Sequence, residues 1–203
     1  MAQPQDPVSI VFDNYVAWKG APTDIARPPQ PAEHVSPAFS VLEYASKQPY
    51  YVFCTAGASY KRIPHSVERF RDPRGVRYEY LIHAPPENSS EILNTLLMVA
   101  SYPFLQNFMY YAGCILPTGG PIVTGSQMEY LYFTYPYEDD PRIFDPPSWG
   151  QIDREDLLIQ TLWVFPIYAS EARYIEQVGV DEFEQLCEKH QIKAYDFSRD
   201  PLV

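Results

Sequence analysis

The sequence is poor in cysteine and histidine, the residues that most often build disulfide frameworks and metal sites. Its cysteines number three and lack the spacing of a metal-binding pair, and an odd count favours reduced thiols. Its four histidines show no pair at helical spacing. The sequence therefore predicts no metal and no cofactor. These residues are Cys54, Cys114 and Cys187, and His34, His65, His83 and His190.

Long apolar runs are also missing. None reaches the roughly 18–20 residues that a membrane-spanning helix needs. The longest candidate, residues 92–108, is interrupted by Asn94, Pro103 and Gln106. The first residues, MAQPQDPVSIVF, lack the basic and apolar regions of a signal peptide. We therefore expect a cytoplasmic protein that has no membrane partner.

Basic residues are scarce in the second half of the chain. The whole chain carries a net charge of −11, and residues 102–203 hold 16 Asp and Glu against 6 Lys and Arg. Nucleic acid is an unsuitable partner for such a surface, because its binding depends on basic residues that neutralise phosphates. A basic protein is a more natural partner, although acidic charge can also serve solubility alone. One basic loop is expected at residues 58–75.

Aromatic residues and proline are abundant. The chain has 17 Tyr and 11 Phe, and 46% of its residues are hydrophobic, which is typical of a globular domain. Its 21 prolines favour many short segments, since proline removes a backbone donor from helices and central strands. We expect residues 1–36 to form an N-terminal helix and a proline-rich arm, and residues 37–203 to form one domain.

Periodicity predicts the order strands, helix, strands, helices. This order is typical of an α+β fold with a mixed, largely antiparallel sheet packed by helices. Expected strands cover residues 38–46, 50–56, 76–84, 128–135 and 157–167. Expected helices are a short one near residues 8–19, a central buried one capped by Ser89 or Ser90 and continuing to Tyr111, one from Ser170 to Val178, and one opened by Asp181.

Two segments of the chain carry further expectations. Alternation in 76–84 places His83 on a polar, exposed face of its strand. Residues 136–156 are polar, acidic and rich in proline, which predicts a long ordered loop, and loops of this kind tend to carry function.

No set of residues converges on a catalytic mechanism. Cys54 and His65 are 11 residues apart, but Cys54 lies in an apolar strand and is expected to be a buried thiol. Ser59 lacks the second glycine of a nucleophile elbow. A calcium or magnesium site at residues 138–140 lacks the acidic spacing of an EF-hand, so a solvated turn is favoured. We predict no catalytic residue and no metal ligand.

Three stretches of the chain, residues 49–64, 77–86 and 162–186, resemble in their order and spacing the Suppressor of Fused (SUFU) domain family. The first two carry the family's Thr-x-Gly-x-Ser element and the glutamate of its next strand, and the third carries a Trp-x-x-Pro-Ile strand, a helix led by glutamate, and a glycine. The matching residues are Thr55, Gly57, Ser59 and Glu79, and then Trp163, Pro166, Ile167, Glu171 and Gly179.

The resemblance implies a SUFU-like fold and a protein-binding role without enzyme activity. Short bacterial members of the family look like immunity proteins that bind a toxin domain. Our leading hypothesis is therefore an immunity-type protein whose acidic face binds a basic toxin domain. Alternatives are a peptide-binding module that adds a strand at a sheet edge, and a hydrolase of unknown substrate; the oligomeric state stays open. The expected face comprises Glu138, Asp139, Asp140, Asp145, Asp153, Glu155 and Asp156.

Overall fold

The computed structural model of the chain describes residues 6–30, 32–136 and 150–203. These residues form one sheet of eight strands, with α-helices on its faces. The strands are β1 (Asp24–Ala26), β2 (Ser40–Ala45), β3 (Tyr51–Ala56), β4 (Arg77–Ala84), β5 (Ile115–Pro117), β6 (Tyr130–Thr134), β7 (Gln151–Arg154) and β8 (Leu157–Ile167). The helices are α1 (Pro7–Lys19), α2 (Ser66–Phe70), α3 (Ser89–Leu105), α4 (Ala169–Val178) and α5 (Val180–Lys189), with short 3-10 helices η1 (Ala58–Tyr60) and η2 (Pro86–Asn88).

The strand order of the sheet is β1-β2-β3-β4-β8-β6-β5, and β7 pairs with β8 beside this path. Neighbouring strands are antiparallel except for β4 and β8, which are parallel. The first half of the long strand β8 pairs with β4 and β7, and its second half pairs with β6. The prediction of an α+β fold with a largely antiparallel sheet is confirmed.

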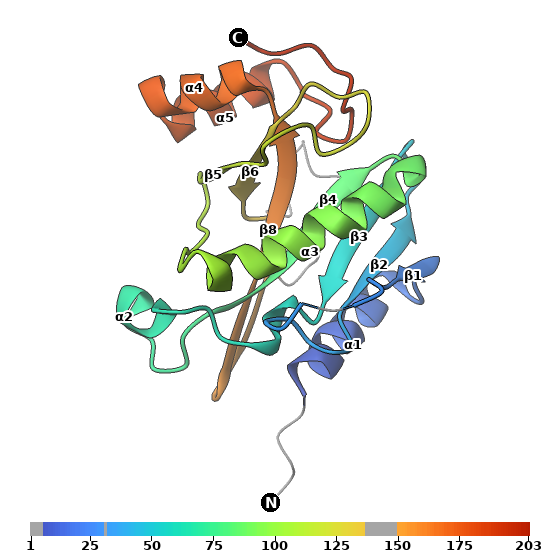
Figure 1. Cartoon of the computed structure of the whole chain (residues 1–203), viewed down its shortest axis with the longest axis vertical. Coiled ribbons are helices and arrows are strands. Elements are labelled where there is room, and N and C mark those ends of the chain that lie inside the picture. The colour runs from blue at the N-terminus through green and yellow to red at the C-terminus, as the bar shows by residue number, and fades with distance from the viewer. Residues whose placement is uncertain (1–5, 31, 137–149) are drawn as a thin grey trace, which may run out of the picture.

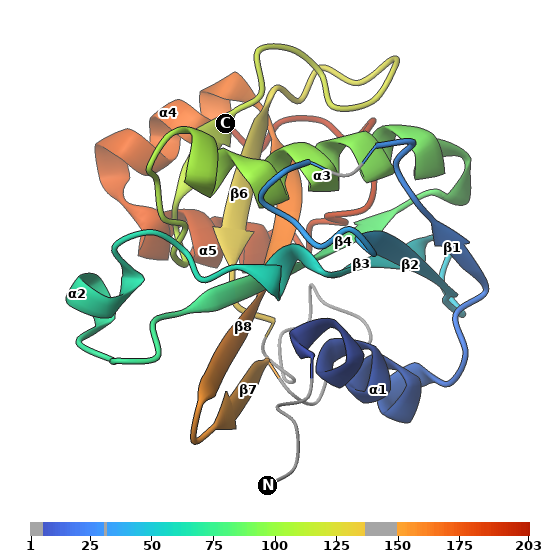
Figure 2. The ribbon, with the colours of Figure 1, turned by 60° about the horizontal axis from the view of Figure 1, so that its bottom comes forward.

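Helices cover both faces of the sheet (Figure 1, Figure 2). Helix α3 lies over one face, where Ile92 and Leu96 join Tyr80 of β4 in one buried cluster. Helices α1, α4 and α5 cover the other face, where Phe183 of α5 and Trp163 of β8 belong to a second buried cluster. The central strands are therefore buried on both sides, and the two clusters account for the high aromatic content of the chain.

Burial of β4 on both faces corrects the expectation of an exposed His83. The His83 residue is 2% exposed, and its ring centroid lies 4.9 Å from that of Tyr50 and 5.9 Å from that of Trp163. The alternation in this segment separates two different buried faces, because a second helical layer covers the side that the sequence pattern left to solvent.

Helix ends differ from the predicted ends at several points. Helix α3 stops at Leu105 instead of continuing to Tyr111, and Phe108 N–H then donates to the Pro103 carbonyl at 3.1 Å. The predicted N-terminal helix is confirmed as α1, which ends before Gly20. The N-cap residues are Asn88, Tyr168 and Gly179, in place of the predicted Ser89 or Ser90, Ser170 and Asp181.

The predicted loop at residues 136–156 is wrong over its last part. Residues 151–154 form β7, which pairs with the start of β8 as a hairpin. Within β7 only Ile152 is buried, so the strand carries almost no hydrophobic signal and depends on backbone pairing with β8. Residues 137–149 lie outside the described part of the chain.

Residues before position 37 supply α1 and β1. Strand β1 pairs with β2, and Ile25 stands opposite Leu42 in their register. The division of the chain into a 1–36 arm and a 37–203 domain remains a prediction. In the part of the chain that the structure describes, no helix is both long and apolar enough to cross a bilayer.

Candidate functional site

The acidic residues predicted to bind a partner fall into two groups. Glu138, Asp139, Asp140 and Asp145 lie outside the described residues. The other three lie at the tip of the β7–β8 hairpin, and all three are exposed: Asp153, Glu155 and Asp156.

One arginine ties this hairpin to the preceding basic loop. The Arg74 guanidinium lies 2.5 Å from Asp153 Oδ1 and 2.7 Å from Asp72 Oδ2. Hydrogen bonds from Arg74 lower the pKa of Asp72 to about 2. Asp153 is therefore partly neutralised within the chain, whereas Glu155 and Asp156 form no ion pair with a described residue.

A second acidic group lies on α4 and α5, far from the hairpin. Glu176, Asp181 and Glu182 are exposed around the turn between these helices. Strand β8 connects the two groups along its 11 residues, which span roughly 35 Å. Figure 1 shows the hairpin tip at the lower end of the molecule and α4 and α5 at the upper end. The two groups are therefore separate surfaces.

Four family-motif residues meet around one buried carboxylate. Glu79 is 0% exposed, and its Oε1 accepts hydrogen bonds from Gly57 N at 3.1 Å, Ser59 N at 3.0 Å and Ser59 Oγ at 2.6 Å. Its Oε2 accepts from Thr55 Oγ1 at 2.5 Å, and Thr55 Oγ1 in turn accepts from Tyr80 N at 2.8 Å. The carboxylate thus fixes the exit of β3 against β4.

Gly57 makes this arrangement possible. Its φ of 111° lies in the left-handed region, and a Cβ there would lie 2.9 Å from Ser36 Cβ. The turn after β3 therefore requires glycine, and it aims two backbone N–H groups at Glu79. Among the described residues no lysine or arginine forms an ion pair with Glu79, so only hydrogen bonds stabilise its ionised form.

Burial raises the pKa of Glu79 above the ordinary glutamate value of 4.5, against the lowering effect of its hydrogen bonds. The folded chain thus keeps a proton that the unfolded chain releases at about pH 4.5. Relative to a Glu79→Gln variant, which cannot titrate, the wild type should be most stable below that pH. Its advantage should fall as pH rises through the folded pKa. Urea unfolding of both proteins across this pH range tests the sign, and an advantage that grows with pH would contradict it.

Glu171 organises the C-terminal segment in a similar way. Its side chain is 0% exposed and receives two hydrogen bonds from Arg199, at 2.6 and 2.8 Å. The backbone N–H groups of Tyr168 and Leu202 also donate to it, at 2.9 and 3.0 Å. The carboxylate therefore caps the start of α4 and holds residues 199–202 against it, a role that its place in the family motif alone did not indicate.

The remaining motif residues lie in strand β8 and at the junction of α4 with α5. Trp163 and Ile167 are wholly buried in β8, and Gly179 joins α4 to α5. At Pro166 the strand pairs with Leu131 of β6, and the described pairing with β4 ends at Trp163. Proline is tolerated here because one edge of β8 no longer needs its N–H group for the sheet.

The side chains considered as nucleophiles are inaccessible. Cys54 is 0% exposed, and burial raises the pKa of its thiol. Ser59 is 0% exposed, and its hydroxyl donates to Glu79. In the part of the chain that is described, no group of three or more His, Cys, Asp or Glu residues could hold a metal ion.

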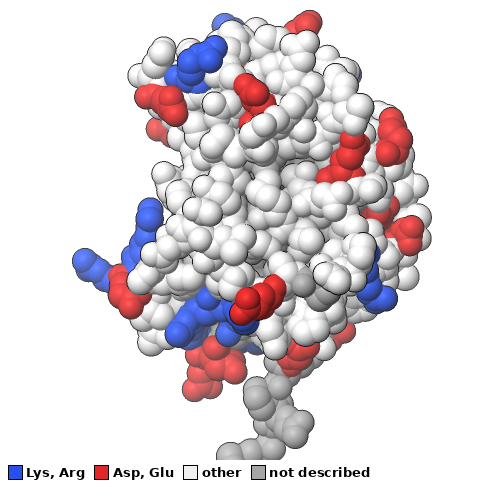
Figure 3. All heavy atoms as spheres, viewed as in Figure 1, with Lys and Arg blue, Asp and Glu red and all other residues white. Residues whose placement is uncertain are grey.

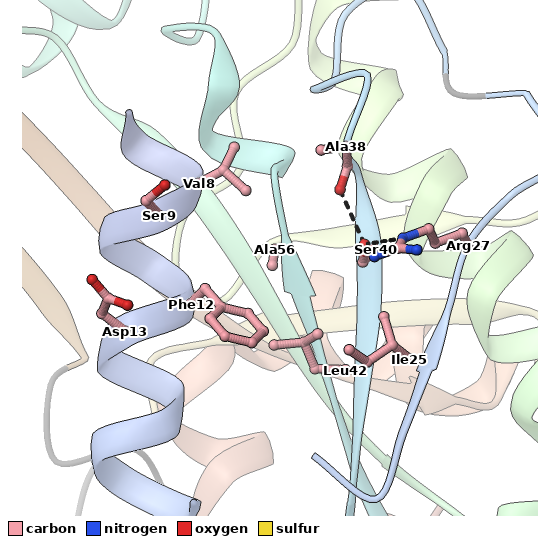
Figure 4. A pocket seen from close by; sticks show the side chains of 10 residues that line it. All are labelled: Val8, Ser9, Phe12, Asp13, Ile25, Arg27, Ala38, Ser40, Leu42 and Ala56. Carbon is pink, nitrogen blue, oxygen red and sulfur yellow. Dashed lines mark hydrogen bonds between the residues drawn. The ribbon is translucent and has the colours of Figure 1, made fainter. Parts of the chain in front are cut away.

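A groove of about 250 Å³ lies between α1 and the edge strand β1. Figure 4 shows Phe12, Leu42 and Ile25 facing one another across it. On the β1 side, Arg27 Nε donates to Ser40 Oγ at 3.2 Å. Ile25 is 38% exposed, so this edge of the sheet offers both a strand and an apolar hollow. Hydrophobic periodicity does not predict this groove, because the groove depends on how α1 packs beside β1 and β2.

Comparisons with known proteins agree with this architecture. The family model described as Suppressor of fused protein (SUFU) matches residues 36–200. No curated protein sequence matches the chain. A crystal structure of a SUFU homologue from Neisseria gonorrhoeae FA 1090 is 20% identical with a TM-score of 0.68, over 98% of this chain and 97% of that one.

Two further solved structures share the fold at lower identity. A crystal structure of the Sufu–Fu complex is 12% identical with a TM-score of 0.70, over 98% of this chain and 93% of the matched chain. Drosophila Suppressor of Fused is also 12% identical, with a TM-score of 0.68, over 98% of this chain and 52% of the matched chain.

Proposed function

The chain belongs to the Suppressor of fused protein (SUFU) family, and from this premise we propose that it is a non-enzymatic protein-binding domain of the immunity type. It binds a basic toxin domain in the cytoplasm and neutralises it by covering its surface. The Sufu–Fu complex is an assembly of a protein of this fold with another protein, which supports a binding role for the fold.

The acidic tip of the β7–β8 hairpin is the observation that carries the proposal. Glu155 and Asp156 are exposed at one end of the molecule and lack an ion-pair partner among the described residues. They also continue the acidic stretch of residues 138–145 along the chain. Complementary charge of this kind accelerates encounter with a basic partner and improves selectivity.

Reversal of the hairpin charges tests the proposed face. The partner is the C-terminal domain of a secreted protein encoded beside the gene of this chain, and its affinity is measured by calorimetry. Glu155→Lys/Asp156→Lys should weaken binding about tenfold or more, because each lysine faces a basic surface. Asp153 is left unchanged, since its ion pair with Arg74 serves the fold. Adding Glu138→Lys, Asp139→Lys and Asp140→Lys should abolish binding.

The matched control is Glu87→Lys/Glu129→Lys, which makes the same change of net charge at two exposed sites elsewhere. It should bind like the wild type. Equal weakening by both variants would mean that net charge alone weakens binding, and would refute the hairpin as the binding face. A neighbouring toxin domain that does not bind the wild type would refute the immunity function itself.

The edge strand β1 and its groove favour a second candidate, a module that binds an extended peptide by strand addition. Backbone pairing along β1 would provide affinity, and an apolar side chain would fill the hollow beside Ile25 and Phe12. Salt separates the two candidates in the same calorimetric experiment. Charge-driven docking weakens as salt rises, whereas strand addition retains its affinity.

A further inference from the structure

A cluster of arginine and aromatic side chains lies on α2, outside every site described above. We define it as the α2 patch: Arg69, Phe70, Arg71 and Tyr111. Arg69 lies over the ring of Tyr111, with its Cζ 5.3 Å from the ring centroid. Phe70 is 37% exposed and Tyr111 is 45% exposed. Exposed aromatic and arginine residues are the types enriched at the centres of protein interfaces.

The backbone around this patch is held in costly conformations. His65 and Arg71, which bracket α2, have φ values of 56° and 54°, and Asn107, which precedes Tyr111, has a φ of 52°. Positive φ costs arginine more than it costs glycine or asparagine, and it tends to persist where a site needs it. At position 71, glycine would adopt this backbone more easily than arginine, so folding alone does not account for the guanidinium there.

The turn between α4 and α5 is the chemical complement of the α2 patch. We define it as the acidic turn: Glu176, Val178, Asp181 and Glu182. Val178 is 43% exposed and is flanked by these three exposed carboxylates. Arg173 is also exposed on α4 and lies three residues before Glu176, so the acidic turn has one basic neighbour. An apolar centre with acidic flanks thus matches Phe70, which has Arg69 and Arg71 on either side, with one exposed carboxylate, Glu68, also on α2.

The two surfaces are neighbours on one side of the molecule. Tyr111 contacts α2 through Arg69, and two residues later a Cβ at Gly113 would come within 2.7 Å of Val180 Cγ2, at the start of α5. Figure 3 shows mainly basic residues, with some acidic ones, at the lower left, and both acidic and basic residues at the upper left, with uncharged surface between them. A typical interface of about 800 Å² per partner is wide enough to include both.

From this arrangement we propose that the chain forms a twofold homodimer through this side. The α2 patch of one copy binds the acidic turn of the other, and the reverse contact forms at the same time. A twofold interface requires a surface that is complementary to itself, which neighbouring patches of opposite charge provide. A phosphate-bearing partner fits less well, because a chain with net charge −11 repels it. The proposal does not depend on the toxin partner.

Charge reversal with complementation tests the dimer. Sedimentation velocity of the full chain across a wide concentration range should show a reversible dimer. Arg69→Glu/Arg71→Glu and Glu176→Lys/Glu182→Lys should each raise the dissociation constant about tenfold or more. An equal mixture of the two variants should regain a heterodimer, because each acidic surface then faces a basic one in both contacts. The control Glu87→Lys/Glu129→Lys should dimerise like the wild type.

Arg71→Gly separates folding from binding at this surface. Glycine removes the conformational cost of the positive φ at position 71. The variant should therefore fold at least as stably as the wild type, while its dimer should be weaker. A wild type that stays monomeric at every concentration, reversals that leave the dimer intact, or a mixture that stays monomeric would each overturn the proposal. If the chain is a monomer and Arg69 and Arg71 bind a DNA oligonucleotide, the α2 patch is a phosphate-binding surface, and this result would also overturn the dimer proposal.

Discussion

Replacing Glu79 by alanine is expected to lower the free energy of unfolding by about 3–5 kcal/mol. The change removes the acceptor for Gly57 N, Ser59 N and the hydroxyls of Ser59 and Thr55, in a site from which water is excluded. Each buried donor left without a partner costs roughly 1–3 kcal/mol, and removal of the buried carboxylate offsets part of the total. Urea denaturation at neutral pH measures the loss.

Glu79→Gln is the matched control for this loss. Its amide oxygen can keep the three hydrogen bonds that Oε1 now accepts, and its amide nitrogen can donate to Thr55 Oγ1. The glutamine variant should therefore lose only about 1 kcal/mol. If alanine and glutamine destabilise the chain equally, the hydrogen bonds contribute little and the buried cluster is not what fixes the β3 exit.

The residues of this cluster can be recognised in the sequence, but the sequence does not predict that they contact one another. A glycine after an apolar strand indicates a tight turn, and a glutamate within the apolar strand of residues 77–84 is an anomaly that signals a buried partner. Thr55 and Glu79 are 24 residues apart, and their contact depends on the antiparallel pairing of β3 with β4. Hydrophobic periodicity predicts such strands but leaves open which of them are neighbours.

Other features differ from the sequence-based prediction because tertiary packing overrides local pattern. The burial of His83 follows from the helices on the second face of the sheet, which alternation within one strand cannot predict. Strand β7 carries a single buried residue, Ile152, and forms because β8 offers a free edge. The predicted order of elements survives both corrections, since it depends on long apolar segments such as residues 157–167, whose pattern is unambiguous.

The acidic face shows a further limit of sequence reasoning. Net charge of the C-terminal half predicts an acidic surface, but charge counts treat the half as one unit. In the fold the carboxylates of the hairpin and those of the α4–α5 turn lie at opposite ends of the molecule, and Arg74 from the other half pairs with Asp153. Two surfaces of similar composition can therefore serve two different partners.

The Arg199→Ala variant is expected to lose about 3–5 kcal/mol of stability, because it leaves the Glu171 carboxylate buried without its cation. Glu171 would keep only the N–H groups of Tyr168 and Leu202, while its side chain is 0% exposed. The stacking of Arg199 over Tyr168, at 5.5 Å, would be lost as well. Urea denaturation measures the loss, and amide hydrogen exchange at Leu202 should report release of the C-terminal segment.

Two further variants separate charge from geometry at this site. Arg199→Lys keeps the charge but loses the paired hydrogen bonds, so it should lose about 1–2 kcal/mol. The double variant Glu171→Gln/Arg199→Met removes both charges and should recover most of the stability that Arg199→Ala loses, because no uncompensated charge remains buried. If Arg199→Ala loses less than the lysine variant, the ion pair does not hold the C-terminal segment, and the hydrogen bonds from the backbone suffice to anchor it against α4.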